Sequence, residues 1–333
     1  WTLEAVPLAR GGLRRAGQLR RAAAADVVVL QRKLLPLWQL CLLRKHARRL
    51  IYDIDDALYC RDSYHTKGTA SWQRMLAFWA TVYAADAVTC GNRHLSAQAA
   101  RFTPIERVRY LPTCIRPEAY PTAVHHRQGA ELKLVWIGQR STVASLDLAG
   151  PGLTAAACRL PGLGLRVISD VFPSLRGIRV EPRAWSEATE AADVADADVG
   201  VSWLPDDAWS LGKCGLKVLQ YMAAGLPVVA NPVGVHRQMV VDGVTGFLVR
   251  RPQECAEAIV RLASEPGLRA RMGRAGRELV ESDFSVRRWQ HEWVAICDGL
   301  AGRRACASAS LCGRRGAIAA GVESSKSFAE TIA

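Results

Sequence analysis

The amino-acid sequence predicts an α/β protein of two domains, each a parallel β-sheet covered by helices. Short β-branched runs recur along the chain with helical stretches between them, and this alternation is typical of parallel sheets. The runs are continuously apolar, as expected for strands that are buried on both faces. The chain has 333 residues, of which 50% are apolar, so it is long enough to form two cores of ordinary size.

The first domain is expected to span residues 1–122. Its strands are predicted at Val27 to Leu30, Leu50 to Ile54, Ala87 to Thr89 and Val108 to Leu111. A helix is predicted between the second and third strands, with apolar residues at helical spacing: Trp72, Met75, Leu76, Trp79, Val82 and Tyr83. We expect this stripe to pack in the core rather than to line a ligand site.

The second domain is expected at 132–284, after a polar linker at 123–131. Its strands are predicted at Leu132 to Ile137, Leu165 to Ser169, Val199 to Trp203, Pro227 to Ala230 and Gly246 to Val249. Its helices are predicted at Ser186 to Ala195, Lys213 to Ala224, Gln253 to Ala263 and Gly267 to Glu281. A closing helix at 285–300 follows. The tail at 301–333 is rich in Ala, Ser and Gly, and we expect it to be mobile.

Composition excludes several classes of protein. No apolar run reaches the length of a membrane-spanning helix, and no charged-then-apolar leader follows Trp1. The 10 cysteines are scattered singly, and neither they nor the adjacent His125 and His126 have the spacing of a zinc site. We therefore expect a cytoplasmic protein with reduced thiols and without a structural metal ion.

The charge is concentrated at one end of the chain. The formal net charge is +13, and residues 1–50 hold 11 Lys or Arg against Glu4 and Asp26. A cationic surface of this kind suits an anionic membrane or a phosphate-bearing acceptor, so peripheral contact with the inner membrane face is one interpretation. A solvated Arg-rich face explains the charge equally well. Nucleic acid is not expected as a partner, because no nucleic-acid-binding module is recognisable.

One predicted helix carries a candidate anion site. If the helix begins at Lys213, then Lys213, Lys217 and Gln220 share one face within about 60° of arc. Two cations and an amide near a helix N-terminus suit a diphosphate and neighbouring hydroxyls, because the helix dipole also favours negative charge there. A solvated helix face is the alternative. The GxxxxGK[ST] and GxGxxG nucleotide motifs are absent from the sequence.

Four segments resemble the family-4 glycosyltransferases of the GT-B fold. They are YLPTCIRPEAY at 110–120, VWIGQRS at 135–141, LQYMAAGLPVVA at 219–230 and VGVHRQMVVDGVTGFLV at 233–249. The resemblance covers roughly residues 26 to 300. It implies two Rossmann-like domains facing a central cleft, with the donor nucleotide in the second. It also implies that the first domain is incomplete at its start, because the family's first domain opens on a strand and a glycine-rich loop that are not seen here.

The departures from the family pattern concern the donor site. The family has two glutamates eight positions apart, and the matching positions here are Gly212 and Gln220. The resemblance implies that Gln220 binds ribose hydroxyls through its amide. It places the diphosphate near the loop Gly138, Gln139 and Arg140, with Arg140 standing in for the family's arginine. Lys213 or Lys217 then supplies the second positive charge.

The resemblance places an acceptor-side catalytic segment in the first domain. IYDIDD at 51–56 lies at the end of a buried strand, where ligands of open α/β sheets bind. Asp53, Asp55 and Asp56 are the candidate catalytic residues. Surface or helix-capping acids are the alternative, and the DxD spelling is also that of a metal-binding motif in the other glycosyltransferase fold, GT-A.

These features together predict an enzyme of the hexosyltransferase type (EC 2.4). It would transfer a sugar from a UDP- or GDP-linked donor to a glycan or lipid-linked acceptor, with retention of configuration and without metal or other cofactor. The resemblance implies a bacterial protein of cell-surface polysaccharide biosynthesis. Two alternatives stay open: a GT-B-type sugar-nucleotide epimerase, and a sugar-nucleotide-binding protein without turnover.

Overall fold

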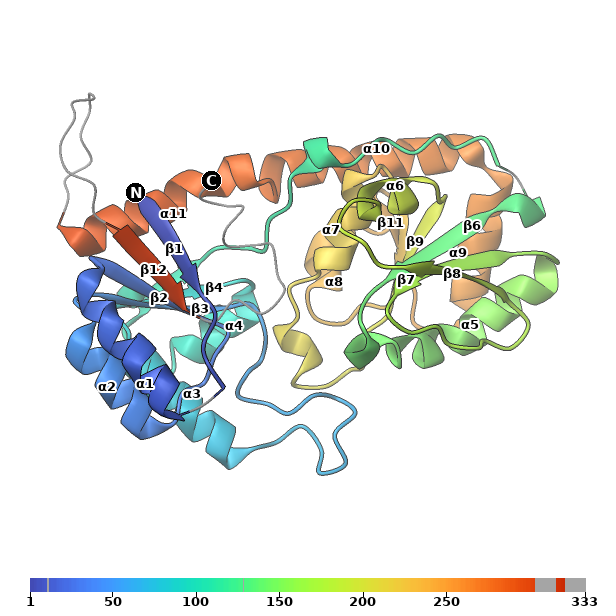
Figure 1. The fold of residues 1–333 in the computed structure, drawn as a ribbon. Helices are drawn as coiled ribbons and strands as arrows, with labels where there is room; N and C mark the ends of the chain where they lie inside the picture. Colours follow the sequence, from blue (N-terminus) through green and yellow to red (C-terminus); the bar gives the residue numbers. More distant parts are fainter. Residues whose placement is uncertain (11, 128, 303–315, 321–333) are drawn as a thin grey trace, which may run out of the picture. The chain divides into compact units, whose positions relative to one another are not determined.

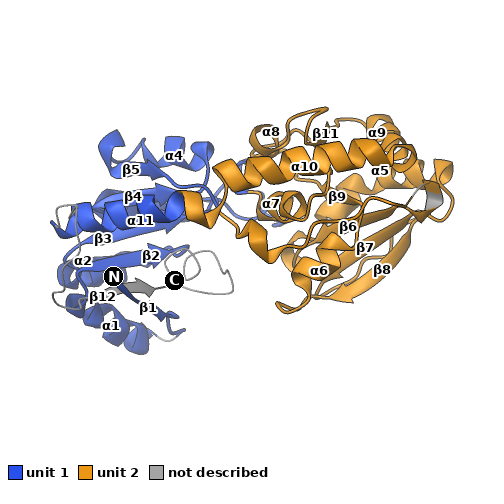
Figure 2. Cartoon of the chain, turned by 90° about the horizontal axis from the view of Figure 1, so that it is seen from above, with its two compact units in different colours: residues 1–113, 207–214, 289–333 blue, residues 114–206, 215–288 orange. Residues whose placement is uncertain are grey.

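The computed structural model describes residues 1–10, 12–127, 129–302 and 316–320. The chain forms two compact units (Figure 2). The first comprises residues 1–113, 207–214 and 289–333, and the second comprises residues 114–206 and 215–288. Each unit is a parallel six-stranded sheet with helices on both faces, so the predicted α/β class with two Rossmann-like domains is confirmed.

The sheet of the first unit has the strand order β1-β12-β2-β3-β4-β5, with every neighbouring pair parallel. Its strands are β1 (Thr2–Val6), β2 (Val27–Gln31), β3 (Leu50–Ile54), β4 (Ala87–Cys90), β5 (Val108–Tyr110) and β12 (Gly316–Ala320). Its helices are α1 (Gly12–Arg21), α2 (Leu37–His46), α3 (Trp72–Ala84) and α4 (Arg93–Ala99), together with most of α11 (Val286–Ala301).

Alternate residues of β2 show why this sheet is covered on both faces. Val28 and Leu30 pack with the helices α1, α2 and α3 in one core cluster. Val27 and Val29 pack on the other face with Trp293 of α11. A strand that is buried on both faces reads as a continuous apolar run, which is why the sequence revealed it.

The sheet of the second unit has the order β11-β10-β9-β6-β7-β8 and is also entirely parallel. Its strands are β6 (Lys133–Ile137), β7 (Gly164–Ser169), β8 (Arg179–Ala184), β9 (Val199–Ser202), β10 (Val228–Ala230) and β11 (Gly246–Leu248). Its helices are α5 (Ser145–Arg159), α6 (Glu190–Ala195), α7 (Leu216–Ala223), α8 (His236–Met239), α9 (Pro252–Ser264) and α10 (Pro266–Asp283). Helices α5 and α9 pack in one core cluster, and α6 and α7 pack in another.

Three strands were not expected from the sequence. β1 and β8 are edge strands with mostly exposed or half-exposed residues, so they lack the apolar run that marks an inner strand. β12 lies within the stretch 301–333 that was expected to be a mobile tail, and Gly316–Ala320 instead pairs with both β1 and β2. Backbone pairing on both sides fixes this segment, although its composition resembles that of a tail. The rest of that stretch, beyond residue 302, lies outside the described residues.

The division into units also differs from the expected domain boundaries. The first unit's first segment ends at Thr113 rather than at residue 122. The unit also includes the segment 207–214, expected in the second domain, and most of α11, expected as the closing helix. Trp293 and Cys297 of α11 are buried against the first sheet, which explains this assignment. α7 begins at Leu216 rather than at Lys213, because Gly215 adopts a left-handed conformation with φ of 72°.

The expected core packing of α3 is wrong for most of its apolar residues. Phe78 and Val82 are buried, but Trp72 is 74% exposed and Tyr83 is 68% exposed. The helix has two apolar faces, and the spacing of the residues alone could not tell which one faces the sheet. Among the described residues, no helix is long and apolar enough to cross a lipid bilayer.

Candidate functional site

The first unit gathers charged side chains where its strands β2 and β3 end. Asp53, near the end of β3, is held by both oxygens: Thr89 donates to Oδ1 at 2.6 Å and Gln31 donates to Oδ2 at 3.0 Å. These bonds link three neighbouring strands. Burial raises the pKa of Asp53, and the two hydrogen bonds oppose that rise. Asp53 therefore connects β2, β3 and β4 through its two hydrogen bonds.

Asp55 lies beyond the end of β3, beside Arg32. The Nε atom of Arg32 is 2.9 Å from Oδ1 of Asp55, but no hydrogen bond to this buried oxygen is formed by the described residues. Burial raises the pKa of Asp55 to about 6, against the opposing charge of Arg32. Arg32 itself follows β2 in a left-handed conformation with φ of 52°, which is rare for a residue with a side chain. Asp55 thus has an Oδ1 atom that accepts no hydrogen bond from the described residues, and a pKa of about 6.

Asp56 forms an ion pair with Lys213. The Nζ atom of Lys213 donates to Oδ2 of Asp56 at 2.9 Å and lies 3.4 Å from the centre of the Trp209 ring. Arg32 is a weaker second partner, with its guanidinium 3.7 Å from the same oxygen. The charge of Lys213 is therefore used within the first unit. We call Arg32, Asp55, Asp56 and Lys213 the first-unit cluster.

The segment 207–214 is fixed in the first unit by backbone contacts. Asn92, which caps the N-terminus of α4, donates its amide to the carbonyls of Leu211 at 3.2 Å and Lys213 at 2.9 Å. A Cβ atom on Gly212 would lie 2.5 Å from the backbone nitrogen of Ala57. A side chain, including the glutamate of the family pattern, cannot be placed at 212 without moving this segment.

The second unit presents a tight loop after β6. Gly138 has no room for a side chain, because a Cβ would lie 2.4 Å from the Trp136 ring and 2.8 Å from Oγ1 of Thr142. The backbone N–H of Arg140 donates to Oδ1 of Asp170 at 2.9 Å, and the Arg140 side chain is 3.6 Å from the same carboxylate. Both side chains are largely exposed, so Arg140 remains available to a ligand on this surface.

Lys217 lies in the first turn of α7. Its Nζ atom is 4.3 Å from the centre of the buried Trp136 ring, so the ammonium is held by a cation–π contact on the side of the Gly138 loop. Gly215, which precedes the helix, has Met239 and Val235 packed where its side chain would stand. This packing directs the first turn of α7 and positions Lys217. We call Gly138, Arg140, Trp136 and Lys217 the second-unit cluster.

A buried histidine lies near enough to the second-unit cluster to feel the charge of Lys217. His236 contacts the Ser202 hydroxyl through Nε2 and the Asn231 carbonyl through Nδ1, both at 2.9 Å. Burial, together with the charge of Lys217, lowers the pKa of His236 to about 4, against the opposing hydrogen bond with Asn231. The Asn231 side chain pairs with both backbone groups of Leu204 and so fixes the loop after β9. His236 is neutral at pH 7 and adds no competing positive charge.

Gln220 belongs to a different network. Its amide nitrogen donates to Oε1 of Glu190 at 2.8 Å and lies 3.3 Å from the Tyr120 hydroxyl, and Glu190 also accepts hydrogen bonds from Tyr120 and Trp185. This network is mostly buried. The Gln220 amide N–H groups are therefore engaged inside the unit.

The structure regroups the residues that the sequence singled out. Lys213 does not share a helical face with Lys217 and Gln220, because it precedes α7 and is paired with Asp56. Sequence reasoning missed Arg32, Trp136 and His236. Arg32 and His236 follow directly or closely on strand ends, a position that could have marked them. The contact of Trp136 with Lys217 depends on the fold and had no signal in the sequence.

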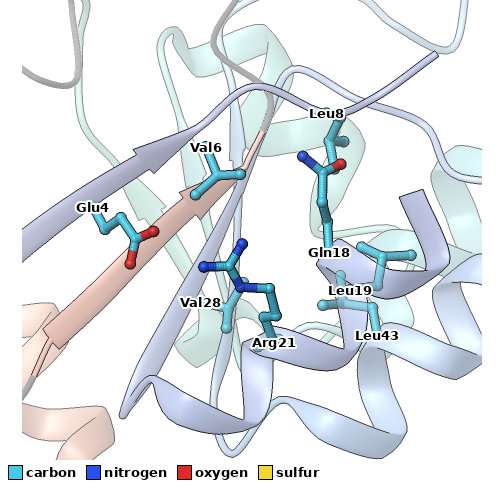
Figure 3. Close-up of a pocket in the computed structure, with 9 residues that line it drawn as sticks. Glu4, Val6, Leu8, Gln18, Leu19, Arg21, Val28 and Leu43 are labelled. Atoms are coloured by element: carbon cyan, nitrogen blue, oxygen red, sulfur yellow. The ribbon is translucent and has the colours of Figure 1, made fainter. Parts of the chain in front are cut away.

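Neither the pocket found in the described residues nor any metal-binding cluster adds to these two clusters. A small pocket lies between β1 and α1 (Figure 3), lined mainly by apolar side chains with Glu4 and Arg21 at its margin. None of the predicted catalytic or donor-binding residues lines it. The described part of the chain contains no group of three or more His, Cys, Asp or Glu side chains placed to hold a metal ion.

A protein-family model matches part of the chain. Residues 118–265 match the model of "Glycosyl transferases group 1". This stretch is less than half of the chain, and it lies in the second unit except for residues 207–214. It contains the whole second-unit cluster.

Curated relatives match over short stretches. The chain is 34% identical over 88 residues to trehalose synthase from Pyrococcus horikoshii, which is 26% of this chain and 21% of that protein. It is 44% identical over 66 residues to D-inositol 3-phosphate glycosyltransferase from Kribbella flavida, which is 19% of this chain and 16% of that protein. A protein of the same name from Nocardiopsis dassonvillei is 34% identical over 132 residues, covering 38% of this chain and 28% of the relative. The matches thus span only 16% to 28% of these relatives' lengths.

Solved structures match over most of the chain. HepE from Anabaena, in complex with UDP and glucose, has a TM-score of 0.67 at 14% identity, covering 87% of this chain and 83% of HepE. Sucrose-phosphate synthase from Thermosynechococcus elongatus has a TM-score of 0.64 at 19% identity, covering 83% and 73%. At these identities the likeness concerns the fold. The chain therefore has the α/β fold of GT-B glycosyltransferases, and its residues 118–265 match the group 1 glycosyl transferases.

Proposed function

We propose that the chain is a glycosyltransferase that transfers a sugar from a nucleotide-diphosphate sugar to a glycan or lipid-linked acceptor. The observation that carries the proposal is the second-unit cluster, which lies at the carboxyl ends of parallel strands and inside the stretch that matches group 1 glycosyl transferases. Relatives that are named as glycosyltransferases, and a structural neighbour in complex with UDP and glucose, support the same class of donor.

The second-unit cluster suits the departing diphosphate. When the bond between the sugar's anomeric carbon and the diphosphate oxygen breaks, negative charge develops on the leaving group. Lys217 and Arg140 supply positive charge, and the missing side chain at Gly138 lets the backbone approach the phosphates closely. Because His236 is neutral near pH 7, it adds no second positive charge beside Lys217.

The first-unit cluster suits the acceptor. Of the three aspartates, Asp53 is tied to Thr89 and Gln31, and Asp56 is paired with Lys213. Asp55 has a buried oxygen that accepts no hydrogen bond from the described part of the chain, and its pKa is about 6. We assign Asp55 the role of accepting a hydrogen bond, and then the proton, from the acceptor hydroxyl, because a base of this pKa is effective near neutral pH.

Finer features of the proposal rest on the family resemblance. They are retention of configuration, a hexosyl group as the transferred sugar, a UDP- or GDP-linked donor, and a role in bacterial cell-surface polysaccharide synthesis at the cytoplasmic side. Neither cluster requires a metal ion for the steps described, because side-chain cations neutralise the diphosphate.

Binding without turnover is the second candidate function. It is favoured by one observation: Gly212 occupies the position of the family's first glutamate, and its contact with Ala57 leaves no space for a carboxylate. Donor hydrolysis separates the two candidates. An enzyme releases UDP or GDP from its sugar nucleotide even without acceptor, whereas a binding protein retains the donor intact.

The donor site is tested by calorimetry with UDP- and GDP-sugars. Lys217→Ala removes one charged contact, so donor affinity should fall about ten- to one-hundred-fold, equivalent to about 1 to 3 kcal/mol. Lys45→Ala, an exposed lysine on α2, is the matched control and should bind the donor like the parent protein. Unchanged affinity in the Lys217 variant would remove the second-unit cluster from the proposal.

A further inference from the structure

One face of α3 is apolar and exposed. Trp72, Leu76, Trp79 and Tyr83 recur at intervals of four, three and four residues, which places them within about 60° of arc on the helix. Phe78 and Val82 lie on a different face of the helix and pack in the core. All four stripe residues are at least 41% exposed, and the rings of Trp79 and Tyr83 stack at 6.1 Å. We call these four residues the α3 stripe.

Neighbouring helices extend this apolar surface. α1, α2 and α3 cover the same face of the first sheet, because their buried residues share one core cluster (Figure 1). α2 exposes Leu37 and Trp38 near its N-terminus, and α1 exposes Leu13 almost completely. Exposed aromatic and aliphatic side chains on adjacent helices are unusual for a surface that meets only water.

The charge of this surface has one sign. α1, α2 and α3 together contain seven Lys or Arg and not one Asp or Glu. The cations are Arg14, Arg15, Arg20, Arg21, Arg44, Lys45 and Arg74. Arg44 is paired with Asp86, while Arg14, Arg20, Arg21, Lys45 and Arg74 are exposed. The outer surface of the three helices is therefore both apolar and cationic.

We propose that the α3 stripe and the cations of α1 and α2 form a docking surface for an anionic lipid membrane. Trp and Tyr prefer the headgroup region of a bilayer, because the ring body is apolar and the ring edge carries a polar group. Helices that lie in this region combine such rings on one side with Lys and Arg beside them. Anionic lipids attract each cation, and the attraction weakens as salt rises.

Charge also argues against a second copy of the chain as the occupant. Two such surfaces would bring like charges together, which disfavours self-association. An anionic lipid surface satisfies the cations and covers the rings at the same time. Lipid binding by this face does not depend on the proposed sugar transfer and can be tested without substrate.

The test is co-sedimentation with vesicles of phosphatidylcholine, with and without about a third phosphatidylglycerol. The full chain should bind the anionic vesicles at least ~10-fold more strongly than the neutral ones, and less at high salt. The double variant Trp72→Ala, Tyr83→Ala should lose about ten-fold or more in binding to anionic vesicles. Both positions are exposed in a helix that tolerates alanine, so the variant should fold normally, as circular dichroism will show.

Two further variants make the result decisive. Arg14→Gln with Lys45→Gln should weaken binding to anionic vesicles and reduce its salt dependence. Ile105→Ala with Phe172→Ala removes two exposed apolar side chains outside the surface and should leave binding unchanged. Absent or composition-independent binding overturns the proposal, as does binding that the control variant loses equally. Sedimentation velocity showing a dimer that the Trp72 and Tyr83 variant abolishes would also overturn it, in favour of a self-association surface.

Discussion

Three aspartates within four positions, Asp53, Asp55 and Asp56, have three different environments. Asp53 is fixed by two neutral donors, Asp56 by an ammonium group, and Asp55 lies beside a guanidinium that gives its Oδ1 atom no hydrogen bond. In the sequence, residue type and spacing could not distinguish one of these aspartates from another. In the structure, Asp53 connects neighbouring strands, Asp56 forms an ion pair, and Asp55 is the candidate base.

Asp55 should impose a pH dependence on activity. Its pKa of about 6 means that the carboxylate is mostly protonated at pH 5 and mostly charged at pH 7. Transfer activity should therefore rise between these values with a midpoint near 6, and Asp55→Asn should lower kcat by about a hundred-fold or more. A pH profile of kcat/KM for the parent protein measures the midpoint.

The same group should affect stability in the opposite direction. The folded-state pKa lies above the value of an unfolded aspartate, so the folded protein binds more protons between about pH 4 and 6 and loses stability as the pH rises through that window. Asp55→Asn removes this cost, and its free energy of unfolding relative to the parent should increase by about 1 to 3 kcal/mol from pH 4 to pH 7. Urea unfolding at the two pH values measures it. A difference that does not change with pH would show that Asp55 titrates normally.

At the scale of elements, strands were easier to predict than the contacts of loops. β3 was predicted with its observed ends, because a short, mostly apolar run between two arginines and two aspartates has few alternatives. The pairing of Asp56 with Lys213 joins residues 157 positions apart, and no local pattern encodes it. The start of α7 was misplaced because the helix-like spacing of Lys213 and Lys217 gave no warning of the left-handed Gly215.

The segment 207–214 should be sensitive to any side chain at Gly212. Gly212→Ala places a methyl group 2.4 Å from the Cβ of Ala57, so the segment or its neighbour must move. We expect a loss of about 1 to 3 kcal/mol in the free energy of unfolding. Gly17→Ala on α1 is the matched control, because nothing lies within 4 Å of its Cβ position, and it should be neutral or stabilising by up to about 1 kcal/mol. Equal effects of the two substitutions would contradict this account of position 212.

For the whole molecule, the fold was predictable to a greater extent than the arrangement of the charged groups. Two parallel sheets follow from apolar runs and their alternation, which are properties of local sequence. The orientation of the apolar faces of α3 and the return of 207–214 to the first unit depend on which surfaces pack together. The sequence offered Trp72 and Tyr83 as core residues because an apolar side chain looks the same whether it faces a sheet or lies exposed.

Activity of the whole chain should survive the removal of metal ions. The DxD spelling of Asp53 and Asp55 suggested a metal motif, but both oxygens of Asp53 accept hydrogen bonds and Asp55 pairs with Arg32. Transfer measured after exhaustive EDTA treatment should stay within about two-fold of the untreated protein, because Lys217 and Arg140 neutralise the diphosphate. Loss of activity that Mn²⁺ restores would identify these aspartates as metal ligands instead.

The return of the chain to the first unit has a consequence for synthesis on the ribosome. Residues 114–206 and 215–288 form the second unit, whereas the first needs residues 207–214 and the strand Gly316–Ala320, which separates β1 from β2 in its sheet. The carbonyl groups that accept hydrogen bonds from Asn92, at Leu211 and Lys213, are synthesised about 120 residues later. The unit that is synthesised first therefore completes its folding last, after the second has all its residues. During that interval the edge of β2 and the Asn92 amide lack their partners, which is when association with other nascent chains is most favourable.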